Sequence, residues 1–398
     1  MKEEIIRNLL GRPESLFDSD FLLTKDKIIE KARQSTFVVV GGAGSIGSSV
    51  VRLLVNLKAK KIQVVDISEN NLVELIRDIR SSNNDVLTEI ETYAMDCGSE
   101  EFVKYFMEQP SVDYLLNFSA LKHVRSERDV YTLKRLVDVN VINPVSLLKL
   151  ANEKGCKKYF CVSTDKATNP VSMMGASKLL MERIILSQQT DVKVSTARFA
   201  NVAFSDGSLL FGLEHRLNKK QPLAIPTDIR RFFVTPEEAG QLCIVSCLVA
   251  DDKEILFPQT SIKFEDISLV DITSKYLRMK GFEPTPVDSE RLARQSVEKC
   301  IEEEKWPCFY FESDTTGEKP FEEFFAKNER VDLKRFKNIG VVQFDANINK
   351  IDYGRFTKLY DEFKNLTNWT KPELVDVFRT FLPSFLHNEK NKNLDQKM

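Results

Sequence analysis

The sequence predicts an α/β fold, a Rossmann-type doubly wound parallel sheet with a smaller C-terminal substrate lobe. Two observations predict it. From residue 37 onward, short apolar runs alternate with segments whose apolar residues recur at helical spacing, which is typical of βαβ units. A glycine-rich run at 41–47 follows the first apolar run directly, and a helical pattern from 48 to 57 comes next.

The strands are expected where the apolar runs are continuous, because the strands of a parallel sheet are covered on both faces. We place them at residues 37–40, 62–65, 114–116, 159–162 and 194–197, with a further strand-like run at 92–95. After the second strand, Leu72, Leu75, Ile76 and Ile79 share one face of a helix.

The clean alternation fades after about residue 205, where Pro222, Pro226 and Pro236 interrupt the pattern. We therefore expect four parts: an N-terminal arm (1–35), an NAD-binding Rossmann domain (36–205), a substrate lobe with some chain returning to the sheet (206–340), and a C-terminal helical extension (341–398) ending in a loose polar tail from His387. The arm should pack on the domain or on a neighbouring subunit through its apolar residues, Leu9, Leu10, Leu16, Phe17, Phe21 and Leu22.

The composition excludes several classes of function. Among 398 residues, 57 Lys and Arg balance 59 Asp and Glu, so no net positive field favours nucleic acid or an anionic membrane. No apolar run approaches the ~20 residues that span a bilayer, and the first twelve residues are too charged for a secretory signal, so we expect a cytoplasmic protein. The seven cysteines lack the spacing of a zinc site or a disulfide framework, and Cys243 and Cys247 are expected to be buried thiols; no metal is predicted.

A dinucleotide site is predicted at the glycine-rich run, where glycines let the backbone approach a pyrophosphate at the start of a helix. The run is Gly41, Gly42, Ala43, Gly44, Ser45, Ile46 and Gly47. Asp66 ends the second strand, 19 residues after Gly47, where a carboxylate binds ribose hydroxyls and repels a 2′-phosphate, so NAD is favoured over NADP. Asp96 is placed either to meet the adenine or to cap a turn. Arg77 and Arg80 are assigned to a solvated helix face.

Four further segments follow in order: 117–124 (Asn-Phe-Ser-Ala-Leu-Lys-His-Val), 163–166 (Ser-Thr-Asp-Lys), 174–178 (Met-Gly-Ala-Ser-Lys) and 317–319 (Gly-Glu-Lys). With the glycine run and Asp66, the chain resembles the nucleotide-sugar 4,6-dehydratases of the extended short-chain dehydrogenase superfamily, of the UDP-N-acetylglucosamine, polysaccharide-biosynthesis type. It looks like a form without a membrane anchor. Met174 stands where that superfamily normally has a catalytic Tyr, four residues before Lys178.

The resemblance implies an internal redox cycle in which NAD takes hydride from sugar carbon 4, water leaves from carbon 6, and the hydride returns to carbon 6. Asp165 would be the acid at the leaving hydroxyl and Lys166 the base at carbon 5. Thr164 would contact the carbon 4 hydroxyl and Lys178 the nicotinamide ribose, with Ser119 and Ala120 also beside the cofactor. The expected contacts to the nucleotide sugar are Lys122, His123, Arg198, Asn201 and Arg231.

Several alternatives stay open at this point. A thioether cannot accept the proton of the carbon 4 hydroxyl, so that role passes to Thr164 through a water, to water alone, or to Lys166. The nucleotide could be UDP or GDP, and carbon 5 could keep or invert its configuration. An NDP-sugar epimerase or reductase and a non-catalytic NAD sensor are the competing functions. The resemblance also implies a homodimer or larger assembly, paired through the helices around 133–151 and 174–186.

Overall fold

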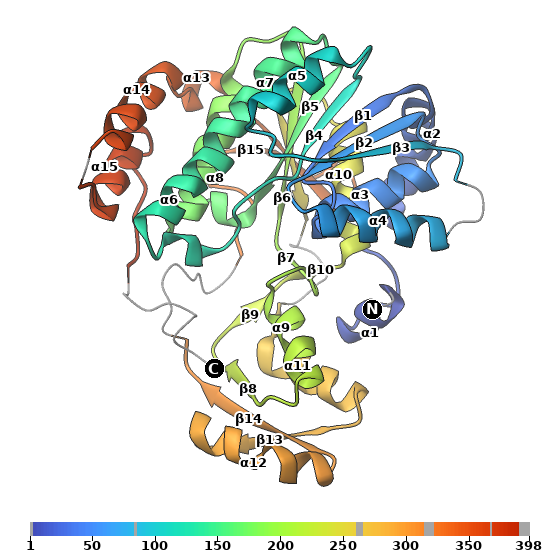
Figure 1. The fold of residues 1–398 in the computed structure, drawn as a ribbon, viewed down its shortest axis with the longest axis vertical. Coiled ribbons are helices and arrows are strands. Elements are labelled where there is room, and N and C mark those ends of the chain that lie inside the picture. Colours follow the sequence, from blue (N-terminus) through green and yellow to red (C-terminus); the bar gives the residue numbers. More distant parts are fainter. Residues whose placement is uncertain (1–2, 83–85, 260–265, 314–321, 367, 390–398) are drawn as a thin grey trace.

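The computed structural model describes residues 3–82, 86–259, 266–313, 322–366 and 368–389 (Figure 1). Within them, a large lobe is built around a nine-stranded sheet, and a smaller lobe hangs below one end of it. The sheet is mostly parallel with helices on both faces, so the predicted α/β doubly wound fold is confirmed.

The parallel part of the sheet has the strand order of a Rossmann fold. It runs β3 (Glu89–Ala94), β2 (Lys61–Asp66), β1 (Thr36–Val40), β4 (Tyr114–Asn117), β5 (Lys158–Thr164), β6 (Lys193–Phe199), β11 (Glu254–Pro258). Antiparallel strands β16 (Ile339–Gln343) and β15 (Arg330–Asp332) complete the edge beside β11. All five predicted strands are present, each slightly longer than expected.

Helices cover both faces of the sheet, because each crossover between parallel strands places its helix on one side. One face carries α2 (Asp18–Gln34), α3 (Ser45–Asn56), α4 (Glu69–Ser82) and α10 (Pro236–Leu248). The other carries α5 (Glu100–Glu108), α7 (Asn143–Glu153) and α8 (Met173–Ser187), with η1 (Val124–Glu127), α6 (Val130–Val137) and a π-helical turn, η2 (Asp138–Ile142), leading into α7.

The smaller lobe has its own apolar core around a three-stranded parallel sheet in the order β13-β14-β8. Its elements are α9 (Leu209–Asn218), β8 (Leu223–Pro226), α11 (Leu269–Met279), β13 (Glu283–Val287), α12 (Glu290–Glu302) and β14 (Lys305–Phe311). Two short pairs lie between the lobes: β7 (Asn201–Val202) with β10 (Phe233–Val234), and β9 (Arg230–Arg231) with β12 (Ile267–Ser268). Between and after these elements the chain returns to the large sheet at β11, β15 and β16.

The N-terminal arm clamps both lobes of its own chain. Helix α1 (Glu3–Leu9) contributes to the core of the small lobe, and α2 packs on α10. Arg12 is buried between them, and its Nη2 donates to Glu238 Oε2 and to the Phe233 carbonyl, both at 3.0 Å. Phe17 is fully buried as expected, but Leu22 is 61% exposed, so the prediction that it packs is wrong.

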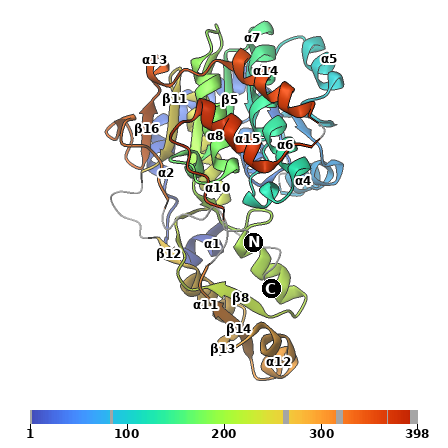
Figure 2. The same ribbon diagram turned by 90° about the vertical axis from the view of Figure 1, so that its left-hand side faces the viewer.

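The C-terminal extension forms α13 (Ala346–Asn349), α14 (Tyr353–Lys364) and α15 (Lys371–Phe381), which lie over the outer side of α6 and α8 (Figure 2). The helices expected to pair subunits are thus covered by the chain's own C-terminal helices. The tail was expected to be loose from His387, yet the His387 side chain is only 8% exposed. Residues 390–398 lie outside the described residues.

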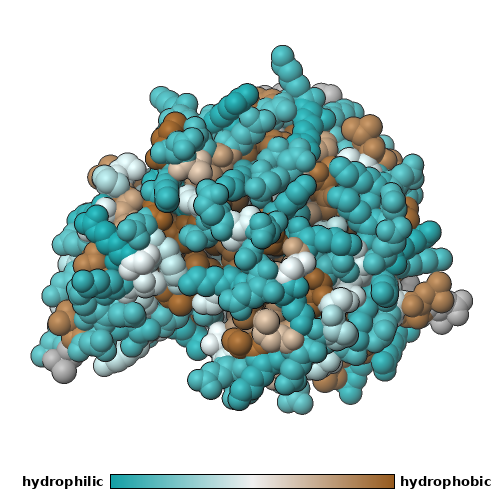
Figure 3. Space-filling model, turned by 90° about the horizontal axis from the view of Figure 1, so that it is seen from above, coloured by the Kyte–Doolittle hydropathy of each residue, from teal (hydrophilic) through white to brown (hydrophobic). Residues whose placement is uncertain are grey.

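The described ranges contain no helix long and apolar enough to cross a bilayer. Seen from above, the large lobe presents mainly hydrophilic side chains, with apolar ones showing between them (Figure 3). All seven cysteines are free and buried, and within the described ranges no group of three or more His, Cys, Asp or Glu side chains is placed to hold a metal ion.

Candidate active site at the carboxyl ends of the strands

Several of the predicted site residues lie close together because the carboxyl ends of β1, β4 and β5 meet at one edge of the sheet. The glycine loop follows β1, Ser119 and Ala120 follow β4, and Thr164 ends β5. Strand order reverses between β1 and β4, and an open parallel sheet binds its ligands in the crevice at that point.

The glycine loop has no room for side chains at three of its positions. A methyl group on Gly41, whose φ is +68°, would lie 2.7 Å from the Ser119 nitrogen. One on Gly42 would lie 2.5 Å from a valine methyl of β2, and one on Gly47 would lie 2.2 Å from the Gly41 carbonyl oxygen. Gly44 is the N-cap of α3. The first turn of α3 therefore faces the crevice with its backbone N–H groups, which fits a bound pyrophosphate.

Asp66 closes the other side of this loop. Its Oδ2 accepts a hydrogen bond from the Ala43 N–H and its Oδ1 one from the Ser68 N–H, both at 3.0 Å. Ser45, the first residue of α3, donates from Oγ to Asp206 Oδ2 at 2.9 Å. The carboxylate expected to bind ribose thus lies directly beside the glycine loop.

The adjoining strand ends supply smaller contacts. Asp96 Oδ1 accepts from the Gly98 N–H at 2.9 Å, so in this structure it caps a turn, one of the two roles predicted for it. Ser119 Oγ donates to the fully buried Asn117 Oδ1 at 2.6 Å, and Ala120 follows. Asn117 therefore stabilises the turn after β4.

The acid and the amine of the predicted catalytic segment form a direct ion pair. Thr164 Oγ1 donates to Asp165 Oδ1 at 2.8 Å, and Lys166 Nζ lies 3.2 Å and 3.4 Å from the two Asp165 oxygens. The Asp165 side chain is 4% exposed and that of Lys166 is 33% exposed. The turn η3 (Asp165–Ala167) therefore holds a buried carboxylate against an amine that is partly exposed to solvent.

Helix α8 brings the next two predicted residues to the same place. Met174 is buried, and its backbone N–H donates to Glu127 Oε1 at 3.0 Å. Lys178, one turn later, is fully buried; its Nζ donates to the Val162 carbonyl at 3.2 Å, and burial lowers the pKa of its amine. The Met174 side chain contributes no proton-transfer group.

The structure contradicts the prediction that Arg198 contacts the substrate. Its guanidinium is buried and forms a fork with Glu182 (3.0 and 2.7 Å), a second pair with Glu329 (both 2.8 Å), and a hydrogen bond to the Phe324 carbonyl. These contacts use all five N–H donors. Burial alone would lower the pKa of Arg198, but the two carboxylates more than offset it, so the pKa is raised. Arg198 joins β6 to α8 and to the chain preceding β15.

Asn201 and Arg231 do converge, on a residue that the sequence analysis missed. Glu322 Oε1 accepts from Asn201 Nδ2 at 2.7 Å and lies 3.5 Å from Arg231 Nε, while Oε2 accepts from the Phe232 N–H at 3.2 Å. Burial raises the pKa of Glu322 to about 7; Arg231 and Lys166 act to lower it and Asp165 to raise it. Glu322 thus lies within electrostatic reach of the Asp165–Lys166 pair.

The signal for Glu322 was present in its position just after the Gly-Glu-Lys segment at 317–319, which itself lies outside the described residues.

Lys122 and His123 follow β4 as predicted, and a methyl group on Gly207 would lie 2.8 Å from His123 Nε2. The loop after β7 therefore closes over His123. Desolvation, then the charges of Lys122 and Arg125, lower the pKa of His123, which favours its neutral form.

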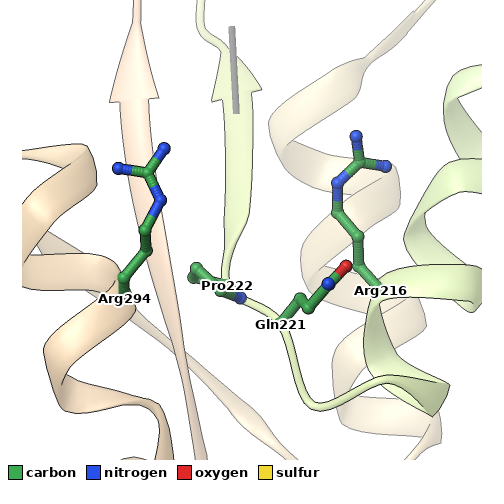
Figure 4. A pocket seen from close by; sticks show the side chains of 4 residues that line it. All are labelled: Arg216, Gln221, Pro222 and Arg294. Carbon is green, nitrogen blue, oxygen red and sulfur yellow. The ribbon is translucent and has the colours of Figure 1, made fainter.

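A cavity of about 280 Å³ lies elsewhere, in the small lobe (Figure 4). It is lined by Arg216, Gln221, Pro222 and Arg294, none of which is a predicted site residue. Arg294 pairs with Glu290, and Arg216 donates to a carbonyl of its own helix. This cavity is separate from the crevice at the strand ends.

The sequence matches the family described as "Polysaccharide biosynthesis protein" over residues 37–343. An uncharacterized membrane protein of Methanocaldococcus jannaschii is 32% identical over 279 residues, which cover 68% of this chain and 80% of that protein. The probable polysaccharide biosynthesis protein EpsC of Bacillus subtilis is 25% identical over 74% of this chain, but the match spans only 48% of its own length. A UDP-N-acetylglucosamine 4,6-dehydratase (inverting) of Campylobacter jejuni is 25% identical over 56% of this chain and 66% of its own.

Solved structures share the fold. Pen from Bacillus thuringiensis has a TM-score of 0.63 and 23% identity, covering 84% of this chain and 98% of its own. WbmF of Bordetella bronchiseptica, determined with NAD+, has a TM-score of 0.50 and 16% identity, covering 63% and 79%.

Proposed function

Because this chain belongs to the polysaccharide biosynthesis protein family, we propose that it catalyses the NAD-dependent 4,6-dehydration of a nucleotide-activated N-acetylhexosamine, UDP-N-acetylglucosamine. The product would be the 4-keto-6-deoxy sugar nucleotide. Two Campylobacter jejuni relatives carry the name of this activity, and the match to the first covers about two thirds of its length. The chemistry of this chain's own residues supports the same reaction.

The observation that carries the proposal is the Asp165–Lys166 pair beside a methionine. A dehydration needs an acid at the departing hydroxyl and a base at the acidified carbon. The pair supplies one of each, 3.2 Å apart, while Met174 supplies neither. Epimerisation and dehydration both begin with removal of the carbon 4 hydroxyl proton, which Met174 cannot accept, but only an elimination also needs the acid and the base that the pair supplies.

The proton inventory balances around this pair. Thr164 is hydrogen-bonded to Asp165, so it can accept the proton of the carbon 4 hydroxyl while passing its own to the carboxylate. Lys166 must be neutral to act as a base, and its partly exposed amine can give a proton to solvent before the elimination. The neutral amine takes the carbon 5 proton and the carboxylic acid protonates the departing carbon 6 hydroxyl. When carbon 6 is reduced, the Lys166 ammonium returns a proton to carbon 5 and the amine regains one from solvent, which regenerates the ion pair.

The residues around the glycine loop fit NAD. Gly41, Gly42 and Gly47 leave the backbone open to a pyrophosphate, Asp66 would bind ribose hydroxyls, and Lys178 would bind the nicotinamide ribose. When bound, NAD supplies reversible hydride transfer, from carbon 4 and back to carbon 6, with no net oxidation. Asp66 disfavours a 2′-phosphate, so NAD and not NADP should be released when the purified protein is denatured.

A panel of nucleotide sugars tests the proposal. The purified protein is incubated with UDP-N-acetylglucosamine and, separately, GDP-N-acetylglucosamine, and the products are weighed by mass spectrometry. Loss of one water from the UDP sugar alone supports the proposal. Loss from the GDP sugar alone would reassign the nucleotide, an isomer of unchanged mass would indicate an epimerase, and no reaction with either would favour an NAD-binding sensor.

A further inference from the structure

The outer face of α8 is covered by the chain's own C-terminal segment. A helix that only covers a sheet has one apolar stripe, but α8 is buried around its whole circumference, with Arg183 alone partly exposed. It therefore lies between two layers. One layer is the sheet, and the other is the C-terminal cap, which we define as α13, α14, α15 and residues 382–389 (Figure 2).

The cap is attached by apolar side chains and by specific polar contacts. Eight of its apolar side chains are at most 4% exposed and belong to the core of the large lobe: Phe356, Tyr360, Phe363, Leu374, Val375, Phe378, Leu382 and Phe385. The Tyr360 hydroxyl lies 3.0 Å from the Lys134 carbonyl and 3.1 Å from Asp138 Oδ1, and Lys364 Nζ lies 3.3 Å from the same oxygen. This is the face through which a second copy was expected to pair.

Beyond α15, the cap reaches the start of α8. The Asn388 N–H donates to the Val171 carbonyl at 2.9 Å. His387 Nε2 lies 3.0 Å from Glu127 Oε2, and the His387 and Glu127 side chains are 8% and 2% exposed. The other oxygen of Glu127 accepts the backbone N–H of Met174. One carboxylate thus joins the C-terminal segment to the first turn of the helix.

That first turn is in backbone contact with the catalytic segment. A methyl group on Gly175 would lie 2.3 Å from the Lys166 carbonyl oxygen, so no side chain separates α8 from the residue after Asp165. One turn later, Lys178 donates to the last part of β5. A shift of the start of α8 would therefore move Lys166 and Lys178 together.

We propose that the C-terminal cap takes the place of a second subunit on α6 and α8, and that His387 is a positioning residue that fixes the first turn of α8 through Glu127. His387 touches neither substrate nor cofactor in this assignment. Its effect on turnover rests on the proposed function, but its effect on the position of α8 does not. No second copy of the chain then pairs through α6 and α8.

The test compares His387→Ala with His387→Gln, which keeps a donor for Glu127, and with His215→Ala, an exposed histidine on α9, in the full-length protein. Hydrogen exchange of the Met174 and Gly175 amides should accelerate roughly 3- to 10-fold in His387→Ala, as for loss of one hydrogen bond. It should return toward the wild-type rate in His387→Gln. This readout needs no turnover, so it remains informative if the substrate proposal fails.

Activity and mass complete the test. In His387→Ala, kcat should fall about 10-fold with KM and bound NAD unchanged, because a positioning residue acts on the reacting groups, while the melting temperature falls by no more than about 2–4 °C, as for one lost hydrogen bond. A kcat that falls only in proportion to the fraction of unfolded protein would overturn the positioning role. So would unchanged hydrogen exchange of the Met174 and Gly175 amides. Light scattering should give one 45.7 kDa chain. A dimer cross-linked through α6 or α8 would overturn the cap as a substitute for a second subunit.

Discussion

The most quantitative prediction concerns Glu322, whose carboxylate is buried between Asn201, Arg231 and the Phe232 N–H. Burial raises its pKa to about 7, whereas the ordinary value is 4.5. The perturbation is Glu322→Gln, which removes the charge and keeps the size and an acceptor oxygen. In the wild type, the folded protein holds a proton between pH 4.5 and 7 that the unfolded chain has released.

The sign of the effect follows from this difference in proton binding. When the folded state binds more protons, the free energy of unfolding falls as pH rises. A shift of about 2.5 pH units at 1.36 kcal/mol per unit corresponds to roughly 3 kcal/mol. Glu322→Gln should therefore become more stable relative to wild type, by up to about 3 kcal/mol, as pH rises from 4.5 to 7, with no further change above that range.

Urea denaturation at half-unit pH steps, followed by circular dichroism, measures the difference between the two proteins. The matched control is Glu323→Gln, which removes the adjacent carboxylate and leaves the contacts of Glu322 in place; it should keep the wild-type pH dependence. A Glu322→Gln stability difference that stays flat from pH 4.5 to 8 would refute the reasoning. So would a Glu323→Gln variant with the same pH profile as Glu322→Gln.

Five substitutions separate residues that act in the reaction from residues that support the fold. Asp165→Asn and Lys166→Met should each lower kcat by roughly 10²- to 10⁴-fold while NAD stays bound, as measured by turnover and by cofactor released on denaturation. Met174→Ala should be far milder; a loss as large as that of Asp165→Asn, with fold and NAD intact, would contradict the division of roles. Arg198→Met leaves the buried Glu182 and the partly exposed Glu329 without their partner and should destabilise the fold by about 3–5 kcal/mol in urea denaturation. A stable variant with only a raised KM would restore the substrate role. Arg12→Met should destabilise by a similar roughly 3–5 kcal/mol because Glu238 loses its buried partner, and an unchanged unfolding midpoint would show that the arm is not clamped there.

The sequence was informative wherever local physics decides the structure. Continuous apolar runs predicted the parallel strands because both faces of each strand are buried. The positions of Gly41 and Gly47 predicted the cofactor loop, since their surroundings exclude any side chain. The Thr164 to Lys166 segment was placed correctly because it follows a strand whose carboxyl end must meet the crevice.

What the sequence could not decide depends on contacts between distant segments. Arg198 follows an apolar strand and resembles a substrate contact, but Glu182 and Glu329, 16 residues before and 131 after it, use its donors. Glu322 gains its environment from Asn201, 121 residues earlier. The polar composition around His387 predicted a loose tail, because nothing local reveals that Glu127 lies beside it.

The proposed function depends on the Asp165–Lys166 pair performing a dehydration and not an epimerisation. The most direct measurement is proton NMR of UDP-N-acetylglucosamine incubated with the purified protein and no added cofactor. A new methyl doublet from carbon 6 of the product is expected, growing with time in the wild type and absent with Asp165→Asn. Conversion to the carbon 4 epimer with no methyl signal would contradict it.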